Sequence, residues 1–302
     1  GGWCSKTSYS VFGQFLSGMA RMYKATGDVA MRDKAVHLIR EWSKTISRLS
    51  LSHYSYDKTL GGLVDLYEYA DVKEAIPLIE KITEYAVQNL GRIRNPATFE
   101  DHSGGGHPGE GEWYTLSENI YRTYLLTGED KFKIFGDVWR YHHYWGMFTG
   151  KTPLNLKGLH AYSHVNSLSS AAMTYAVTGD SEYLKTIINA YDYFQKTQCY
   201  ATGGFGPSEL LVPEDGTLGR SIEDESKAFY GEWPGNNYKN AGRSFETVCG
   251  SWAIFKLCRY LMMFTGEARF GDWMEKILYN GIGSALPMWG DGKTFYYSDY
   301  RL

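Results

Sequence analysis

One tripeptide recurs four times along the chain, each time after a stretch in which apolar residues are spaced three and four apart. The four copies are Thr26-Gly27-Asp28, Thr127-Gly128-Glu129, Thr178-Gly179-Asp180 and Thr265-Gly266-Glu267. The spacing predicts amphipathic helices. The glycine supplies the left-handed backbone conformation that ends a helix, and the acidic residue after it can cap the next one. Because a second amphipathic run follows each turn, the sequence predicts four helical hairpins.

A fifth hairpin is predicted over residues 60–90, where a Tyr-Ala-Asp turn at 69–71 replaces the repeated form. The turns are too unevenly spaced for a solenoid of short repeats. Only residues 200–206 and 293–300 look extended. We therefore predict an all-α fold with one domain over residues 1–302, an (α/α)6 toroid of helical hairpins with long loops on one face. An ordinary bundle and an open solenoid are the alternatives, because periodicity does not reveal closure.

The composition narrows the class of function. Hydrophobic residues make up 43% of the chain, and 31 basic and 34 acidic residues give a formal net charge of −3. This balance predicts no nucleic-acid partner. No apolar run approaches the roughly 20 residues that span a bilayer, so no membrane partner is expected. The first residues carry no secretion signal, which leaves the localisation unknown, and nothing indicates an oligomeric state.

Aromatic residues form 16% of the chain, a content that suits either wide helix interfaces or the stacking of sugar rings. One aromatic pair, Trp113 and Tyr114, lies in a glycine-rich segment at 101–119. Glycines let a backbone approach a ligand, so we predict that Trp113 and Tyr114 contact the substrate. A surface loop without such a role is the alternative. The segment also contains His102, His107, Glu110, Glu112 and Glu118.

Two histidines, His160 and His164, lie four residues apart at the predicted start of a helix and would share one helical face. This spacing can bind a metal, but the glutamate of the His-Glu-x-x-His pattern is absent. We therefore predict that both histidines donate or accept hydrogen bonds with a polar substrate.

A long segment from Cys199 to Cys249 is rich in carboxylates and glycines. A loop of this length in a compact domain is usually functional or disordered. Cleavage of a glycosidic bond requires a protonated acid at the leaving oxygen. The candidates for this acid are Glu209, Glu223, Glu225 and Glu232.

Glu246 and Cys249 lie three residues apart near the start of a predicted helix, which would place a carboxylate and a thiol on one face. Zinc accepts both ligand types. A single helical cysteine, however, is more often a small buried apolar residue. The four cysteines show no CxxC spacing and leave the redox compartment undetermined; they are Cys4, Cys199, Cys249 and Cys258.

Several stretches, in their order and spacing, resemble the β-L-arabinofuranosidase family, glycoside hydrolase family 127. The resemblance spans nearly the whole chain and rests on His160-Ala161, Tyr200–Gly206, Phe245–Ser251, Phe264–Phe270 and Met274–Asn280. It implies an (α/α)6 toroid followed by β-sandwich domains. It also implies a retaining hydrolase that releases terminal L-arabinofuranose, with a glutamate as acid/base and a zinc-bound cysteine as nucleophile.

Carried over residue by residue, the resemblance assigns roles within this chain. Glu209 resembles the acid/base, and His160 matches a histidine that lines the sugar site. Glu246 matches the zinc-binding glutamate, whereas Cys249 follows one residue later than the ligand cysteine because Val248 occupies the usual position. The family's nucleophile lies in a cysteine pair beyond the segment that ends here at Leu302. The resemblance thus implies a catalytic domain that is incomplete at its C-terminus, with the nucleophile outside the chain.

The shifted zinc motif indicates a divergent branch of the family. Its members would be glycosidases that act on terminal sugars of plant or microbial glycans, and the sugar need not be arabinofuranose. Two alternatives belong to other functional classes. One is a catalytically impaired toroid that only binds glycans. The other is a different toroid enzyme, either a sugar epimerase or an unsaturated uronyl hydrolase.

Overall fold

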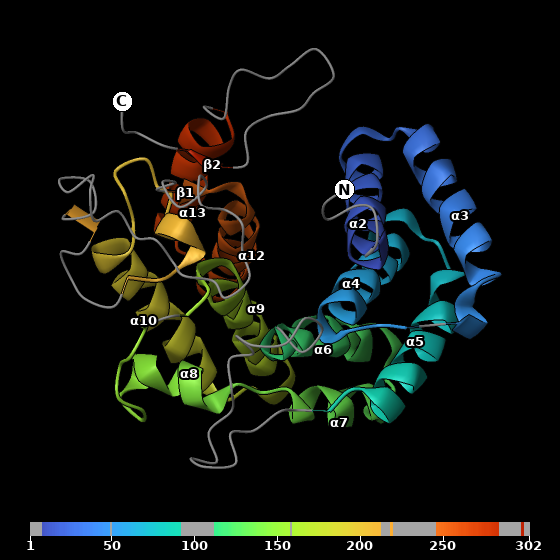
Figure 1. The fold of residues 1–302 in the computed structure, drawn as a ribbon, viewed down its shortest axis with the longest axis horizontal. Coiled ribbons are helices and arrows are strands. Elements are labelled where there is room, and N and C mark those ends of the chain that lie inside the picture. The colour runs from blue at the N-terminus through green and yellow to red at the C-terminus, as the bar shows by residue number, and fades with distance from the viewer. Residues whose placement is uncertain are drawn as a thin grey trace. The chain divides into compact units, whose positions relative to one another are not determined.

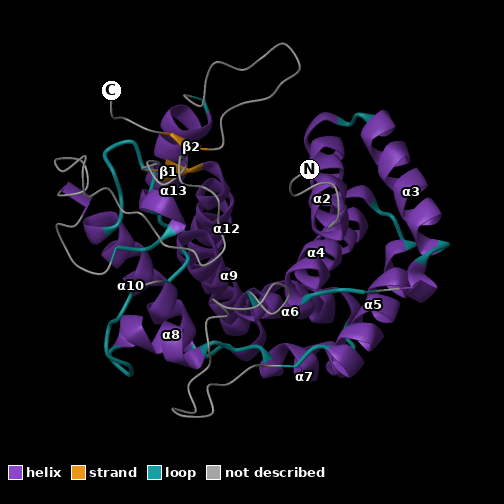
Figure 2. Cartoon of the chain, in the orientation of Figure 1, coloured by secondary structure: helices purple, strands orange, loops and turns teal. Residues whose placement is uncertain are grey.

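The computed structural model describes residues 8–48, 50–91, 112–157, 159–212, 218–219, 246–283 and 297–298. Helices dominate these residues (Figures 1 and 2). The α-helices are α2 (Ser8–Thr26), α3 (Val29–Ser43), α4 (His53–Ala70), α5 (Ala75–Asn89), α6 (Leu116–Thr127), α7 (Asp130–Val138), α8 (His142–Gly146), α9 (Ala161–Thr178), α10 (Ser181–Thr197), α12 (Val248–Thr265) and α13 (Arg269–Lys276). The shorter elements are the 3-10 turns η1 (Ile46–Arg48), η2 (Trp113–Thr115), η3 (Met147–Thr149) and η4 (Pro207–Glu209), the π-helix η6 (Ile277–Ile282), and the antiparallel strands β1 (Glu246–Thr247) and β2 (Tyr297–Ser298).

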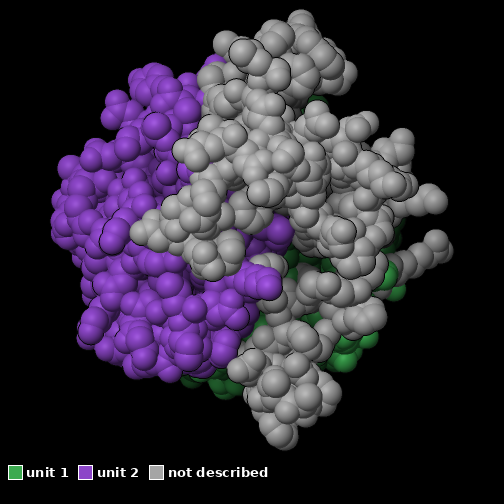
Figure 3. All heavy atoms as spheres, turned by 60° about the vertical axis from the view of Figure 1, so that its left-hand side comes forward, with its two compact units in different colours: residues 1–140 green, residues 141–302 purple. Residues whose placement is uncertain are grey.

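The chain divides into two compact units (Figure 3). Unit 1 comprises residues 1–140 and unit 2 comprises residues 141–302. Each unit is built from helical hairpins with short connections. The helices described are not long and apolar enough for any of them to span a membrane.

The predicted hairpin turns are confirmed, and they share one contact pattern. Gly27, Gly128, Gly179 and Gly266 all have φ between 69° and 73°. In each copy the threonine hydroxyl donates to the carbonyl four residues earlier and accepts the N–H two residues later. At Thr178 these bonds, to Thr174 O and from Asp180 N, are 2.7 and 3.2 Å long. The threonine thus closes the last turn of one helix and orients the first residue of the next. The fifth turn also forms, with Asp71 in the left-handed region at φ 50°.

The acidic caps are confirmed only where the residue is aspartate. Asp28 accepts from Ala30 N at 2.9 Å and Asp180 accepts from Glu182 N at 3.0 Å. Glu129 makes no such bond, and α13 begins after Ala268 rather than after Glu267. Aspartate has the side-chain length that reaches the N2 or N3 amide. The added methylene of glutamate places its carboxylate beyond that amide.

The amphipathic run that follows the turn at Thr127-Gly128-Glu129 forms two helices, α7 and α8, rather than one. Trp139, just after α7, packs its ring edge-on against His53 at 5.5 Å, within unit 1. Tyr141 stacks on Tyr144 at 5.5 Å, within unit 2. These two aromatic residues are buried in different cores, so the helix ends between them.

Helices α2 and α4 of unit 1 pack closely against each other at two glycines, Gly13 and Gly62. A Cβ atom on Gly13 would lie 1.9 Å from Lys58 O, and one on Gly62 would lie 2.3 Å from Gly13 O. Both obstacles are backbone atoms, so neither can move aside as a side chain would. The close approach brings the polar residues of α2 and α4 within hydrogen-bonding distance of each other.

We expect Gly13→Ala to lower the free energy of unfolding by about 1–3 kcal/mol, the usual cost of overpacking. Gly18→Ala is the matched control on the same helix, since its Cβ would meet nothing within 4 Å. Because alanine favours a helix interior, Gly18→Ala should stabilise by about 0.5–1 kcal/mol. Urea unfolding measures the stability of both variants. Changes of the same sign in their free energies of unfolding would contradict the close contact of α2 with α4 at Gly13.

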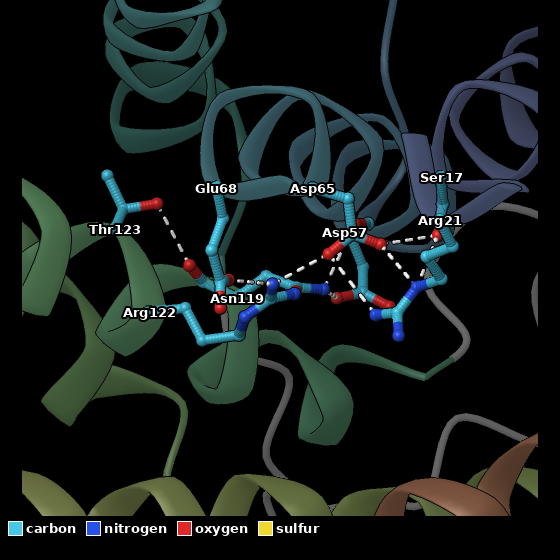
Figure 4. Close-up of polar contacts among 8 residues, drawn as sticks. All are labelled: Ser17, Arg21, Asp57, Asp65, Glu68, Asn119, Arg122 and Thr123. Atoms are coloured by element: carbon cyan, nitrogen blue, oxygen red, sulfur yellow. Dashed lines mark hydrogen bonds and ion pairs between the residues drawn. The ribbon is translucent and has the colours of Figure 1, made fainter. Parts of the chain in front are cut away.

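A buried ionic cluster joins three helices of unit 1 (Figure 4). We call it the Asp65 network; its members are Ser17 and Arg21 of α2, Asp65 and Glu68 of α4, and Arg122 of α6. Asp65 accepts from Ser17 Oγ at 2.5 Å, from Arg21 Nε at 2.8 Å and from Arg122 Nη2 at 2.6 Å. Burial alone would raise the pKa of Asp65, but the two guanidinium groups and the hydroxyl outweigh it and lower the pKa.

Candidate functional site

Three segments that are far apart in the sequence meet in unit 2. His160 is the N-cap of α9, and it forms an antiparallel bridge with Leu210, next to Glu209 in η4. The short strand β1 contacts η4. Helix α12, whose first turn contains Cys249, follows directly after β1.

The ring of His160 is held in a defined orientation. Its Nδ1 accepts from the backbone N–H of Ser163 at 3.4 Å and lies 2.9 Å from Ser163 Oγ. Because Nδ1 is an acceptor, the neutral imidazole carries its proton on Nε2. Nε2 lies 3.8 Å from Oε2 of Glu209. The helix cap therefore directs an N–H group toward the predicted acid/base.

Glu209 adopts a backbone conformation that is rare for a residue with a side chain. Its φ is 65°, in the left-handed region that costs a non-glycine residue roughly 1–2 kcal/mol. Its side chain is 22% exposed and that of His160 is 19% exposed, so both remain reachable. A separation of 3.8 Å is too long for a direct hydrogen bond. One sugar hydroxyl placed between the two groups could contact both.

The segment before Glu209 is fixed by close packing. Gly206 has φ 75°, and a Cβ there would lie 2.6 Å from the Cβ of Ala161 on α9. Phe205 packs against Gly250 of α12, where a Cβ would lie 2.7 Å from the ring. Trp273 Nε1 donates to Gly203 O at 2.6 Å. Glycines and aromatic rings thus anchor this segment to α9, α12 and α13.

His164 is placed differently from its neighbour in sequence. It lies one turn into α9, and its Nδ1 is 2.9 Å from His160 O. The ring is buried against Tyr141 and Tyr144, with centroids 6.0 and 5.0 Å away. Burial lowers the pKa of His164 to about 3. His164 therefore supports the start of α9 as a neutral ring, and its predicted substrate contact stays a prediction.

The remaining sequence candidates fall elsewhere. Trp113 and Tyr114 lie in η2 of unit 1, where both are buried and their rings pack edge-on at 5.6 Å. Their role in substrate binding stays a prediction. Glu112 and Glu118 flank them, with Glu112 in the left-handed region at φ 72°. The other loop candidates, His102, His107, Glu110, Glu223, Glu225 and Glu232, lie outside the described residues.

The predicted zinc ligands do not share a helical face. Glu246 belongs to β1 and α12 begins only at Val248, so the predicted placement of both residues on one helical face is wrong. Cys249 is half-buried in the first turn of α12, whereas the side chain of Glu246 lies outside the described part of the structure. No group of three or more potential metal ligands occurs in the described part of the chain. Zinc, with Glu246 and Cys249 as ligands, therefore stays a prediction from the family resemblance.

Sequence reasoning missed two contributors to the site. Ser163 fixes the tautomer of His160, and the only sequence signal was its position three residues after a helix N-cap. Gln198, which follows α10, contacts the segment after Glu209. No sequence pattern marks Gln198, because its partner is a backbone group 14 residues further on.

Comparison with known proteins identifies the family. The family model described as "Beta-L-arabinofuranosidase, GH127 catalytic domain" matches residues 40–299. No curated protein sequence matches the chain. The solved structures that resemble it include a GH127 β-L-arabinofuranosidase from Geobacillus stearothermophilus T6, with a TM-score of 0.64 and 16% identity over 96% of this chain and 48% of that one.

Two further structures have the same fold. The GH127 β-arabinofuranosidase BT3674 gives a TM-score of 0.62 at 16% identity, over 96% of this chain and 47% of its own. A protein described as a glycoside hydrolase gives 0.67 at 14% identity, over 97% and 49%. The chain spans about half the length of these proteins. The likeness confirms the predicted all-α toroid class, and the match of the family model over residues 40–299 shows that the chain belongs to the GH127 β-L-arabinofuranosidase catalytic-domain family.

Proposed function

We propose that this chain is the helical catalytic region of a glycoside hydrolase that releases terminal sugars and resembles β-L-arabinofuranosidases in its substrate. Membership of the GH127 family supports the reaction class. One observation supports the site: Glu209 lies 3.8 Å from the oriented Nε2 of His160, at the meeting point of η4, α9 and the segment before α12.

In this proposal Glu209 acts as the general acid and then as the base. Its carboxyl group protonates the glycosidic oxygen as the bond to the leaving group breaks, and the carboxylate then takes a proton from the incoming water. His160 donates a hydrogen bond from Nε2 to a sugar hydroxyl, which holds the sugar beside Glu209. Retention of configuration and a zinc-bound cysteine nucleophile remain predictions from the family resemblance. Zinc, with Glu246 and Cys249 as ligands, is proposed on that ground alone.

The proposal is tested by incubating the natural full-length protein with an aryl β-L-arabinofuranoside and following the products by NMR. Release of L-arabinose, first in the β configuration, is the expected result. The same protein is incubated in parallel with free sugars, an unsaturated uronide and a glycan. Three outcomes would then overturn the proposal: an isomerised sugar indicates an epimerase, consumption of the unsaturated uronide indicates a uronyl hydrolase, and saturable glycan binding without any product indicates a binding protein. A panel of aryl glycosides of other sugars tests the substrate within the hydrolase class.

A further inference from the structure

Gln198 is a buried polar residue that links the end of one helix to the loop that carries Glu209. It is the C-cap of α10, and its own N–H donates to Phe194 O at 2.9 Å. The residue is only 1% exposed. A buried amide of this kind requires hydrogen-bonding partners for both its donor and its acceptor.

Both partners belong to the same residue. The Oε1 atom of Gln198 accepts from Val212 N at 2.9 Å, and its Nε2 donates to Val212 O at 3.1 Å. The Nε2 atom also donates to Thr197 Oγ1 at 3.3 Å, and Thr197 Oγ1 donates to Tyr193 O at 2.9 Å. The side chain therefore binds the backbone of Val212 at two points, as a neighbouring β-strand would, and is itself fixed to α10.

The residues between Val212 and Glu209 are held from the other side by the start of α9. Leu211 N donates to Leu159 O at 2.9 Å, and Leu210 forms the bridge with His160. Residues 210–212 thus lie between the amide of Gln198 and the residues that precede α9. Glu209 comes immediately before this clamped segment.

A clamp at this position explains how Glu209 keeps a strained conformation. A non-glycine residue stays in the left-handed region only where its surroundings hold it there. On the N-terminal side, Gly206 and Phe205 are packed against α9 and α12. On the C-terminal side, residues 210–212 attach Glu209 to Gln198 and to the residues that precede α9. If that attachment is lost, Glu209 can relax and its carboxylate moves away from His160.

We propose that Gln198 is a positioning residue for catalysis: its buried carboxamide holds residues 210–212 so that Glu209 directs its carboxylate toward His160. The inference rests on the proposed role of Glu209 as acid/base. A misplacement of about 1 Å at a reacting group can cost on the order of 100-fold in rate. Gln198 itself does not touch the substrate.

The test is Gln198→Met, which keeps the length of the side chain and removes both hydrogen bonds to Val212. We expect kcat to fall about 10-fold to 100-fold for a substrate with an alkyl leaving group, with KM changed less than about threefold. For an activated aryl leaving group, which departs without protonation, kcat/KM should change little, because it reports the step in which the leaving group departs. The matched control is Gln195→Met one turn earlier on α10, where the half-buried side chain donates to Cys199 Sγ; its rates should match the wild type.

A purely structural role for Gln198 gives a different result. In that case Gln198→Met lowers the urea midpoint, but kcat per folded molecule and its dependence on the leaving group stay unchanged, and the inference is wrong. If Gln198→Met does not fold, Gln198→Glu carries the same test, since it keeps the acceptor for Val212 N–H and loses only the donor.

A double-mutant cycle separates this inference from the proposed function. If Gln198 acts through Glu209, adding Gln198→Met to Glu209→Gln causes no further loss in kcat. Full activity of Glu209→Gln would overturn the proposed role of Glu209 as acid/base, on which this inference rests. A large loss in Glu209→Gln together with unchanged kinetics in Gln198→Met would overturn only the role of Gln198.

Discussion

Glu209→Gln is expected to lower kcat by about 10²- to 10⁴-fold on a substrate with an alkyl leaving group, the range that general acid catalysis supplies. Glutamine keeps the shape of the side chain but cannot deliver a proton to the glycosidic oxygen. For a dinitrophenyl leaving group, which needs no protonation, the loss in kcat/KM should be much smaller, because kcat/KM reports the step in which the leaving group departs. Steady-state kinetics of the wild type and the variant on the two substrates measure both losses.

Folding of this variant should be unaffected, because the Glu209 side chain is partly exposed and fills no core position. The control is Glu267→Gln, an exposed glutamate of the same unit that pairs with Arg269 at 2.7 Å. It should retain wild-type rates. Unchanged activity in Glu209→Gln would assign the acid to another loop glutamate, with Glu223 as the next candidate.

Asp65→Asn should be the most destabilising of the variants considered for unit 1. The side chain of Asp65 is 2% exposed and that of Arg122 is 10% exposed, so the charge of each is compensated inside the protein. Removing one charge from a buried pair costs about 3–5 kcal/mol. We expect a loss near the lower end of that range in the free energy of unfolding, because Glu68 still pairs with Arg122 in the variant. Urea unfolding at pH 7 measures it.

The control is Glu74→Gln, which breaks the exposed pair between Arg40 and Glu74 at 2.5 Å. Its urea midpoint should hardly move, since exposed ion pairs contribute little. If Glu74→Gln lowered the free energy of unfolding as much as Asp65→Asn, burial of the ion pair would not be what determines the loss of stability.

The pH dependence of stability gives a second test of the Asp65 network. The folded pKa of Asp65 lies below its unfolded value, which is about 3.9. Its stabilisation is therefore complete well above about pH 4 and is lost as the pH falls through the folded pKa. The difference in stability between the wild type and Asp65→Asn should stay constant from about pH 7 to pH 5 and shrink toward pH 3. A constant difference at every pH would mean that the charge of Asp65 is not what stabilises the fold.

Local chemistry explains which parts of the structure could be predicted from the sequence. The turn at Gly179 depends on a glycine and on hydrogen bonds within four residues, so the tripeptide alone predicts it. The conformation of Glu209 depends on the start of α9, which lies far back in the sequence, and on α12. Such long-range contacts leave no periodic pattern in the sequence.

The same distinction applies to features of the site that local sequence could not show. Whether Glu246 begins a helix or lies in a strand is decided by its pairing with Ser298 in β2, which is remote in sequence. The buried state of His164 is decided by Tyr141 and Tyr144 across the helix interface. The sequence supplied the candidate residues and their chemical types. Their exposure and mutual distances required the packed structure.

In the hairpin of α9 and α10, the connecting turn and the candidate site residue His160 lie at opposite ends. Helix α9 has 18 residues, so the turn at Thr178-Gly179 lies about 27 Å along its axis from His160. That turn is maintained by its own threonine and glycine, independently of the loops beside His160. Insertions and substitutions at the His160 end can therefore accumulate without separating the paired helices. This division suits a fold that this chain shares with solved structures at only 14–16% sequence identity.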